Sequence, residues 1–138
     1  MARHLQYSIK AIIMRKRILI VDDESLILLV LSKLLAAEGT EITTVTNGKD
    51  ALREIAAHHY DLCLLDVYLP DLNGMDIMQR LKDISPHTKV VIMSGSHLDH
   101  SMRSAIKEDA FCFISKPFEL SEVKAMAGRA LEASPLAH

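Results

Sequence analysis

The sequence of 138 residues lacks a long apolar run, an excess of charge of one sign and an internal repeat. Its longest apolar run, Leu26 to Leu31, is far shorter than the roughly 20 residues of a membrane-spanning helix. The apolar stretch Ala11 to Met14 is too short for a secretory signal. A net charge of −2 favours neither nucleic acid nor an anionic membrane as a partner. We therefore expect no membrane association and no direct nucleic-acid binding.

Cysteine is also scarce. Cys63 and Cys112 both lie in apolar runs and have no metal-type spacing. Buried, reduced thiols are the expected state, which is typical of a cytoplasmic protein. The length predicts one domain with a substantial core. We place it at residues 17–134, after an N-terminal extension over 1–16 that we expect to be flexible and before a short tail over 135–138.

Short apolar or β-branched segments alternate with amphipathic segments along the chain. The former predict strands over 18–21, 41–46, 62–66, 89–93 and 111–114, and the latter predict helices over 25–38, 48–59, 75–85, 97–108 and 119–132. This alternation predicts a doubly wound α/β fold, a five-stranded parallel sheet in the order 2-1-3-4-5 with five flanking helices.

The first predicted helix has more apolar residues than one face needs. We expect Leu26, Leu29, Val30 and Leu34 to face the core. The additional apolar residues Ile27, Leu28 and Leu31 leave two interpretations open, a partner-docking patch or a helix that is well covered on most sides.

Polar residues stand where the predicted strands end. Asp22 and Asp23 follow the first strand, Asp66 ends the third, Ser94 follows the fourth and Lys116 the fifth. An aspartate at a strand end can be a turn residue, and Asp22 or Asp23 could cap the helix that begins near Ser25. A cap needs only one acid, however, and the carboxyl ends of parallel strands form the ligand crevice of such folds.

The chemistry of this predicted edge is that of a hard cation site beside a nucleophile. Three carboxylates suit Mg²⁺, which takes a few of them and keeps waters for its remaining positions. Lys116 adds a positive charge and Ser94 a hydroxyl donor. Together these groups fit phosphoryl transfer to an aspartate, in which the carboxylate attacks and the cations neutralise the transferring group.

As a set, these motifs resemble the receiver domain of bacterial two-component response regulators, which has the flavodoxin-like fold. The resemblance covers about Arg17 to Ala133. It rests on Val21-Asp22-Asp23-Glu24, Leu65-Asp66 with Leu69-Pro70 and Asn73-Gly74, Ser94-Gly95, and Phe113 before Lys116-Pro117-Phe118.

The resemblance implies a role for each site residue. Asp66 would be the phosphoacceptor, and Lys116 would contact the phosphoryl oxygens. Asp23, Asp66 and the Tyr68 backbone carbonyl would bind Mg²⁺ directly, with Asp22 assisting through water. Ser94 and Phe113 would be the switch residues that move on phosphorylation. The output face would be the helix predicted over 97–108 with its flanking strands.

The resemblance also implies partners. A sensor histidine kinase or a histidine phosphotransfer protein would donate the phosphoryl group, and a downstream protein or an output domain would receive the signal. A phosphorylation-dependent dimer is one arrangement of this kind. The chain would be a self-phosphorylating and self-dephosphorylating switch and not a turnover enzyme. Tyr68 and Ser96 stand at positions that tune hydrolysis in this family, and we predict that Tyr68 shields the aspartyl phosphate.

Rival interpretations fit less well. A hydrolase of the haloacid dehalogenase type needs an aspartate where Tyr68 stands, and a nucleotide-binding module needs a glycine-rich turn where Asp22-Asp23-Glu24 stands. A degenerate receiver would be a phosphorylation-independent interaction module, but every acidic-site residue is retained. Two alternatives for the whole protein stay open, a stand-alone regulator and a receiver excised from a longer transcriptional regulator.

Overall fold

The computed structural model describes residues 15–37, 39–95 and 97–132 of the chain. Within these residues, parallel strands form one sheet in the order β2-β1-β3-β4-β5. The strands are β1 (Lys16–Val21), β2 (Thr40–Val45), β3 (Leu62–Asp66), β4 (Lys89–Ser94) and β5 (Cys112–Ser115). They alternate with the helices α2 (Ser25–Leu35), α3 (Gly48–Ala57), α4 (Gly74–Ile84), α5 (His100–Asp109) and α6 (Leu120–Glu132). The predicted fold and strand order are confirmed.

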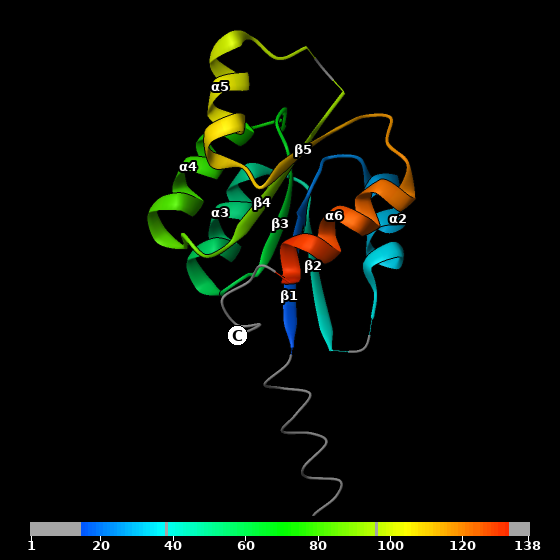
Figure 1. The fold of residues 1–138 in the computed structure, drawn as a ribbon. Helices are drawn as coiled ribbons and strands as arrows, with labels where there is room; N and C mark the ends of the chain where they lie inside the picture. Colours follow the sequence, from blue (N-terminus) through cyan, green and yellow to red (C-terminus); the bar gives the residue numbers. More distant parts are fainter. Residues whose placement is uncertain (1–14, 38, 96, 133–138) are drawn as a thin grey trace, which may run out of the picture.

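The sheet is covered by helices on both faces. Helices α2 and α6 lie on one side and α3, α4 and α5 on the other (Figure 1). In β3, Leu62 and Leu64 belong to the core cluster under α2 and α6, whereas Cys63 and Leu65 belong to the opposite cluster. Because successive side chains of a strand point to opposite faces, a strand buried on both sides must be apolar throughout.

Helix α2 packs through a different face from the one predicted. Leu28, Leu31 and Leu35 are buried, whereas Leu26 and Leu29 are 70% and 51% exposed. The prediction was therefore wrong for Leu26 and Leu29, whereas Leu34 is partly buried against the core. Only Ser25, Ser32 and Lys33 of this helix are polar, so the sequence marks the solvent side weakly. Only the packing of α2 against the sheet and α6 determines its rotation.

Other differences concern the ends of elements. Helix α2 ends at Leu35 and not at Glu38, because the backbone is already extended at Ala36, and Gly39, at a φ of 81°, belongs to the turn into β2. Helix α5 begins at His100 and not at His97, since the Asp99 side chain caps it by accepting from the Met102 amide. Strand β1 begins at Lys16, the last residue of the predicted extension.

Residues 1–14 of the extension and the tail at 135–138 lie outside the described residues. None of the helices described is long and apolar enough to cross a membrane.

Candidate functional site

Four neighbouring strands bring polar residues to one edge of the sheet. Asp22 follows β1 directly, Asp66 and Ser94 are the last residues of β3 and β4, and Lys116 follows β5. The Lys116 amide donates to the Ser94 carbonyl at 3.0 Å, which continues the β4–β5 ladder into the site. The structure therefore brings together the strand-end residues that the sequence singled out, because the parallel strands all end on the same side.

Lys116 joins two of the carboxylates. Its Nζ donates to Asp22 Oδ2 at 2.6 Å and to Asp66 Oδ2 at 3.2 Å, and it lies 3.7 Å from Glu24 Oε1. The lysine side chain is largely buried between these partners. It is therefore held as a fixed positive charge directly beside the Asp66 carboxylate.

The carboxylates themselves form a cluster. Asp22, Asp23 and Asp66 each offer an oxygen, and these oxygens lie within 4.8 Å of one another. Asp22 and Asp66 are buried, whereas Asp23 is exposed at the mouth of the site. This set of hard oxygen donors fits Mg²⁺. These are the carboxylates that the sequence predicted, and the Tyr68 carbonyl as a further ligand stays a prediction.

Asp22 does not cap helix α2. Its Oδ1 accepts from the Glu24 amide at 2.9 Å, while its Oδ2 faces Lys116. The N-cap residue of α2 is Glu24, whose side chain makes no capping hydrogen bond. The interpretation of Asp22 or Asp23 as a helix cap is thus wrong, and both carboxylates remain to be explained by the site.

Burial and charge act on the two central groups in opposite directions. Burial raises the pKa of Asp66 most, Lys116 lowers it, Asp22 raises it again, and the net pKa is raised. For Lys116, burial lowers the pKa, but the hydrogen bond and charge of Asp22 and the charge of Asp66 outweigh it, so the net pKa is raised. Burial thus dominates the pKa shift of Asp66, whereas the two neighbouring carboxylates together dominate that of Lys116.

Tyr68 lies in the loop after β3, beside the acidic site. Its amide donates to Asp66 Oδ1 at 3.3 Å, and its hydroxyl donates to the His97 carbonyl at 2.9 Å. The side chain is 43% exposed. It lines a cavity of about 600 Å³ together with Asp23, Asp66, Lys116 and Phe118. The acidic site is therefore open to solvent on a side that Tyr68 partly covers.

Ser94 and Phe113 border a second cavity. Ser94 is buried, and Phe113 on β5 is 39% exposed. Both line a space of about 520 Å³ with Leu98, Ile106 and Lys116. Ser96 lies outside the described residues.

Comparison with known proteins agrees with this geometry. Residues 18–128 match the family described as the response regulator receiver domain. The chain belongs to this family. It is 35% identical to the DNA-binding transcriptional regulator NtrC of Azospirillum brasilense, over 85% of this chain but only 24% of that protein.

Two further relatives are similar over most of their own length. The receiver is 32% identical to the chemotaxis protein CheY of Thermotoga maritima, over 80% of this chain and 92% of that protein. A CheY-like receiver domain protein from Methanospirillum hungatei superposes with a TM-score of 0.80 at 26% identity, covering 86% of this chain and 94% of the other. The chain thus spans 24% of the NtrC relative and nearly all of the CheY relative.

Gly74 of the receiver is fixed by close approach of the backbone. A Cβ atom there would lie 2.5 Å from the Asp66 carbonyl oxygen and 2.8 Å from Val67 Cα. Its amide donates to the Val67 carbonyl at 2.7 Å, and Tyr68 pairs with Asn73 in an isolated antiparallel bridge. The loop that follows the acidic strand is therefore closed tightly at its base, which the Asn-Gly pair in the sequence signals.

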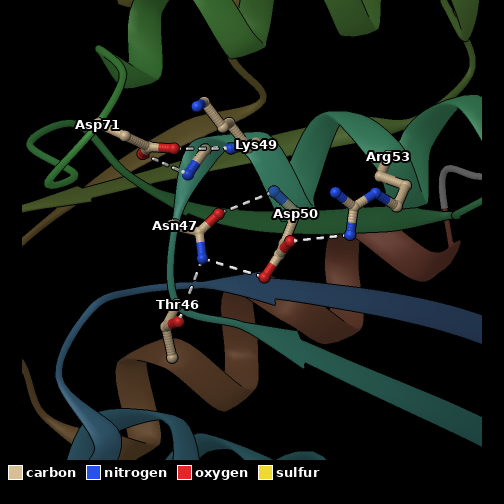
Figure 2. A network of polar contacts seen from close by, with 7 residues as sticks. Thr46, Asn47, Lys49, Asp50, Arg53 and Asp71 are labelled. Atoms are coloured by element: carbon tan, nitrogen blue, oxygen red, sulfur yellow. Dashed lines mark hydrogen bonds and ion pairs between the residues drawn. The ribbon is translucent and has the colours of Figure 1, made fainter.

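The sequence did not predict the contacts of two further acidic residues. Glu24 lies within ion-pair distance of Lys116, and Asp71 binds the first amides of helix α3 from the loop after β3 (Figure 2). The sequence holds no signal for the Asp71 contact, because its partners Gly48 and Lys49 lie more than 20 residues earlier in the chain.

Proposed function

We propose that this receiver is a phosphoacceptor switch in which Asp66 accepts a phosphoryl group from the phosphohistidine of a sensor kinase or of a histidine phosphotransfer protein. The observation that carries the proposal is the Asp66 carboxylate, buried at a strand end among carboxylates and 3.2 Å from the Lys116 ammonium. In the transfer, an Asp66 oxygen forms a bond to phosphorus as the phosphorus–nitrogen bond of the donor breaks, and the donor imidazole keeps the electron pair.

The residues of the site would have separate roles in metal binding and in phosphoryl binding. Asp23, Asp66 and the Tyr68 carbonyl would hold Mg²⁺, with Asp22 contacting it through water. Bound there, Mg²⁺ supplies positive charge that lets an anionic carboxylate approach an anionic phosphoryl group. Lys116 stabilises the phosphoryl oxygens, and its contacts with two aspartates fix its direction before the donor arrives.

The signal leaves the site through Ser94 and Phe113. The Ser94 hydroxyl moves toward the phosphoryl group, and the Phe113 ring turns inward behind it. In support, Phe113 is part-exposed beside a cavity whose apolar lining includes Leu98 and Ile106 of the α5 region. The output surface is then α5 with β4 and β5, a two-state element biased by one charge event.

The donor is proposed to dock over the α2 side of the site. Leu26 and Leu29 are exposed on α2, and Ile27 lines the acidic cavity with Phe118. Exposed leucines beside a catalytic opening favour a protein partner over a small molecule. The chain then works as a switch that gains and loses its own phosphoryl group, and not as a turnover enzyme.

A second candidate concerns the whole protein. The NtrC relative, a DNA-binding transcriptional regulator, is matched over only 24% of its length, which favours a receiver that controls an output domain. The CheY relative is matched over 92%, which favours a stand-alone regulator. In both cases the receiver itself works by phosphorylation of Asp66.

The test is intact mass after incubation with acetyl phosphate, with and without Mg²⁺. We expect one added phosphoryl group on the wild type that needs Mg²⁺ and is absent in Asp66→Asn. Asp61→Asn is the matched control, since Asp61 is a buried aspartate at the other end of the same strand. No added mass on a folded wild type with Mg²⁺ would reject phosphoacceptor function and favour a phosphorylation-independent interaction module.

A further inference from the structure

We propose that Asp71 is a positioning residue that ties the loop after Asp66 to helix α3 and thereby holds the Tyr68 carbonyl for Mg²⁺. This inference rests on the proposed function, because it assigns Asp71 to the same metal site. The Asp71 carboxylate binds the start of helix α3 and not the acidic cluster, so its effect on the metal site must pass through the loop between residues 68 and 73.

Both carboxylate oxygens of Asp71 accept hydrogen bonds from the start of helix α3. Oδ1 accepts from the Gly48 amide at 2.7 Å, and Oδ2 accepts from the Lys49 amide at 3.0 Å (Figure 2). Two consecutive amides at a helix N-terminus bind a carboxylate well, because both the unpaired N–H groups and the helix dipole favour negative charge. The hydrogen bond from Gly48 is also the main cause that lowers the pKa of Asp71.

The contact does more than cap the helix, because α3 already has its own cap. Asn47 Oδ1 accepts from the Asp50 amide at 2.8 Å, and Asn47 Nδ2 donates to Asp50 Oδ2 at 3.0 Å. Arg53 pairs with the same aspartate at 3.2 Å (Figure 2). Asn47 thus satisfies the Asp50 amide from next to the helix in sequence, whereas Asp71 satisfies the Gly48 and Lys49 amides from the distant loop, so only the Asp71 contact also restrains that loop.

The loop is rigid enough to transmit this restraint. Its base is closed by the Gly74–Val67 hydrogen bond and by the bridge between Tyr68 and Asn73. Near the tip of the loop, the Leu72 side chain packs closely on Gly48. A Cβ atom added to Gly48 would lie 2.6 Å from Leu72 Cβ. The loop is therefore fixed at its base, which includes Tyr68, and at its tip, where Leu72 and Asp71 contact helix α3.

The two residues that cap helix α3, Asn47 and Asp71, should therefore have different effects. Asn47 stabilises α3 alone, whereas Asp71 stabilises α3 and also sets the path of the backbone that bears the Tyr68 carbonyl. Removal of either cap should weaken the fold. Only the loss of Asp71 should weaken Mg²⁺ binding, because outer residues that orient a ligand atom change metal affinity.

The experiment measures the Mg²⁺ dissociation constant by isothermal titration calorimetry and the urea midpoint, for the wild type, Asp71→Ala, Asp71→Asn and Asn47→Ala. We expect Asp71→Ala to weaken Mg²⁺ binding about tenfold, the low end of the range for residues that orient metal ligands. Asp71→Asn keeps one acceptor oxygen and should weaken binding less. Asn47→Ala should lower the urea midpoint and leave the dissociation constant unchanged.

Equal Mg²⁺ affinity in Asp71→Ala and the wild type would overturn the proposal, as would an equal loss in Asn47→Ala. Phosphorylation by acetyl phosphate gives a separate readout. We expect Asp71→Ala to need more Mg²⁺ for half-maximal rate and to regain the wild-type rate at saturating Mg²⁺. If the wild type binds Mg²⁺ but gains no phosphoryl group, the proposed function fails while the calorimetry still decides the role of Asp71.

Discussion

A buried aspartate, Asp61, precedes strand β3 and another, Asp66, ends it, and the two differ in how their charge is balanced. Asp61 is 1% exposed, and its Oδ2 accepts from the Arg17 amide at 2.9 Å. Its own amide and carbonyl pair with Arg17 and with Lys89, so fixed backbone groups hold it on two sides. Asp66 is 7% exposed, but it shares Lys116 with Asp22 and faces an open cavity.

This difference shows what separates a structural carboxylate from a reactive one. At the amino end of the strand, the Arg17 amide donates to the Asp61 carboxylate, which also lies 3.5 Å from His59 Nε2, and the Arg17 contact stabilises the register between β1 and β3. At the carboxyl end, carboxylates outnumber the nearby lysine, and burial raises the pKa of Asp66. A buried group that its surroundings leave under-compensated is available for a cation and for chemistry.

The largest effect should come from removing the cation that Asp66 shares with Asp22. We expect Lys116→Ala to slow phosphorylation by acetyl phosphate by about 100-fold, the scale for losing one preorganised group at a developing charge. Lys82→Ala is the control, because it removes an exposed lysine that pairs with Asp109 at 2.6 Å. Equal phosphorylation rates in Lys116→Ala and Lys82→Ala would show that the charge of Lys116 has no special role beside Asp66.

The next effect concerns the amino end and changes stability instead of rate. Asp61→Ala leaves the part-buried Arg17 amide without its Asp61 acceptor, which should lower the free energy of unfolding by about 1 kcal/mol. Urea denaturation measures this loss. Asp61→Asn keeps an acceptor oxygen and should cost less. A large loss of phosphorylation rate in folded Asp61→Asn would contradict a purely structural role.

The raised pKa of Asp66 predicts that replacing this residue stabilises the protein, whereas replacing Asp61 destabilises it. Protonation of Asp66 is favoured in the folded state, so its contribution to stability is present below the unfolded pKa and is lost as pH rises through the folded pKa. Without Mg²⁺ at pH 7, Asp66→Asn should therefore raise the free energy of unfolding, by on the order of 1 kcal/mol. The gain should vanish at acidic pH.

Mg²⁺ should change the stability of Asp66 and Asp61 variants differently. Urea midpoints measured with Mg²⁺ should rise for the wild type and much less for Asp66→Asn, because binding to the folded state alone stabilises it. Asp61→Asn should respond to Mg²⁺ as the wild type does. If Asp66→Asn is less stable than the wild type in the presence of a chelator, the site is not under-compensated as described.

The smallest effect concerns the cover over the carboxyl end. Tyr68→Ala should shorten the lifetime of the aspartyl phosphate by a few-fold, because the ring lies at the mouth of the cavity beside Asp66. Decay of the phosphorylated mass over time measures it. Tyr68→Phe keeps the ring and loses the hydrogen bond to the His97 carbonyl, so it separates shielding from the tie between loops. An unchanged or longer lifetime in Tyr68→Ala would disprove shielding.

The sequence by itself was sufficient for the order of the elements and for the acidic edge. Apolar strands that alternate with helices permit few topologies, and parallel strands must end on one side, so Asp22, Asp66, Ser94 and Lys116 were predictable as neighbours. Short-range signals also held where the residue acts on its own neighbourhood. Asn47 caps α3 as predicted, because the cap and the amide that it accepts from are three residues apart.

Tertiary structure alone decided the features that depend on distant partners. The rotation of α2 follows from its packing, since an almost wholly apolar helix does not mark its own buried face. Lys116 reaches Asp22 across 94 positions of sequence, and Asp71 reaches Gly48 across 23. Periodicity and local motifs report on interactions within a few residues. The balance of charge around Asp61 and Asp66 is therefore set by contacts that form only when the strands assemble.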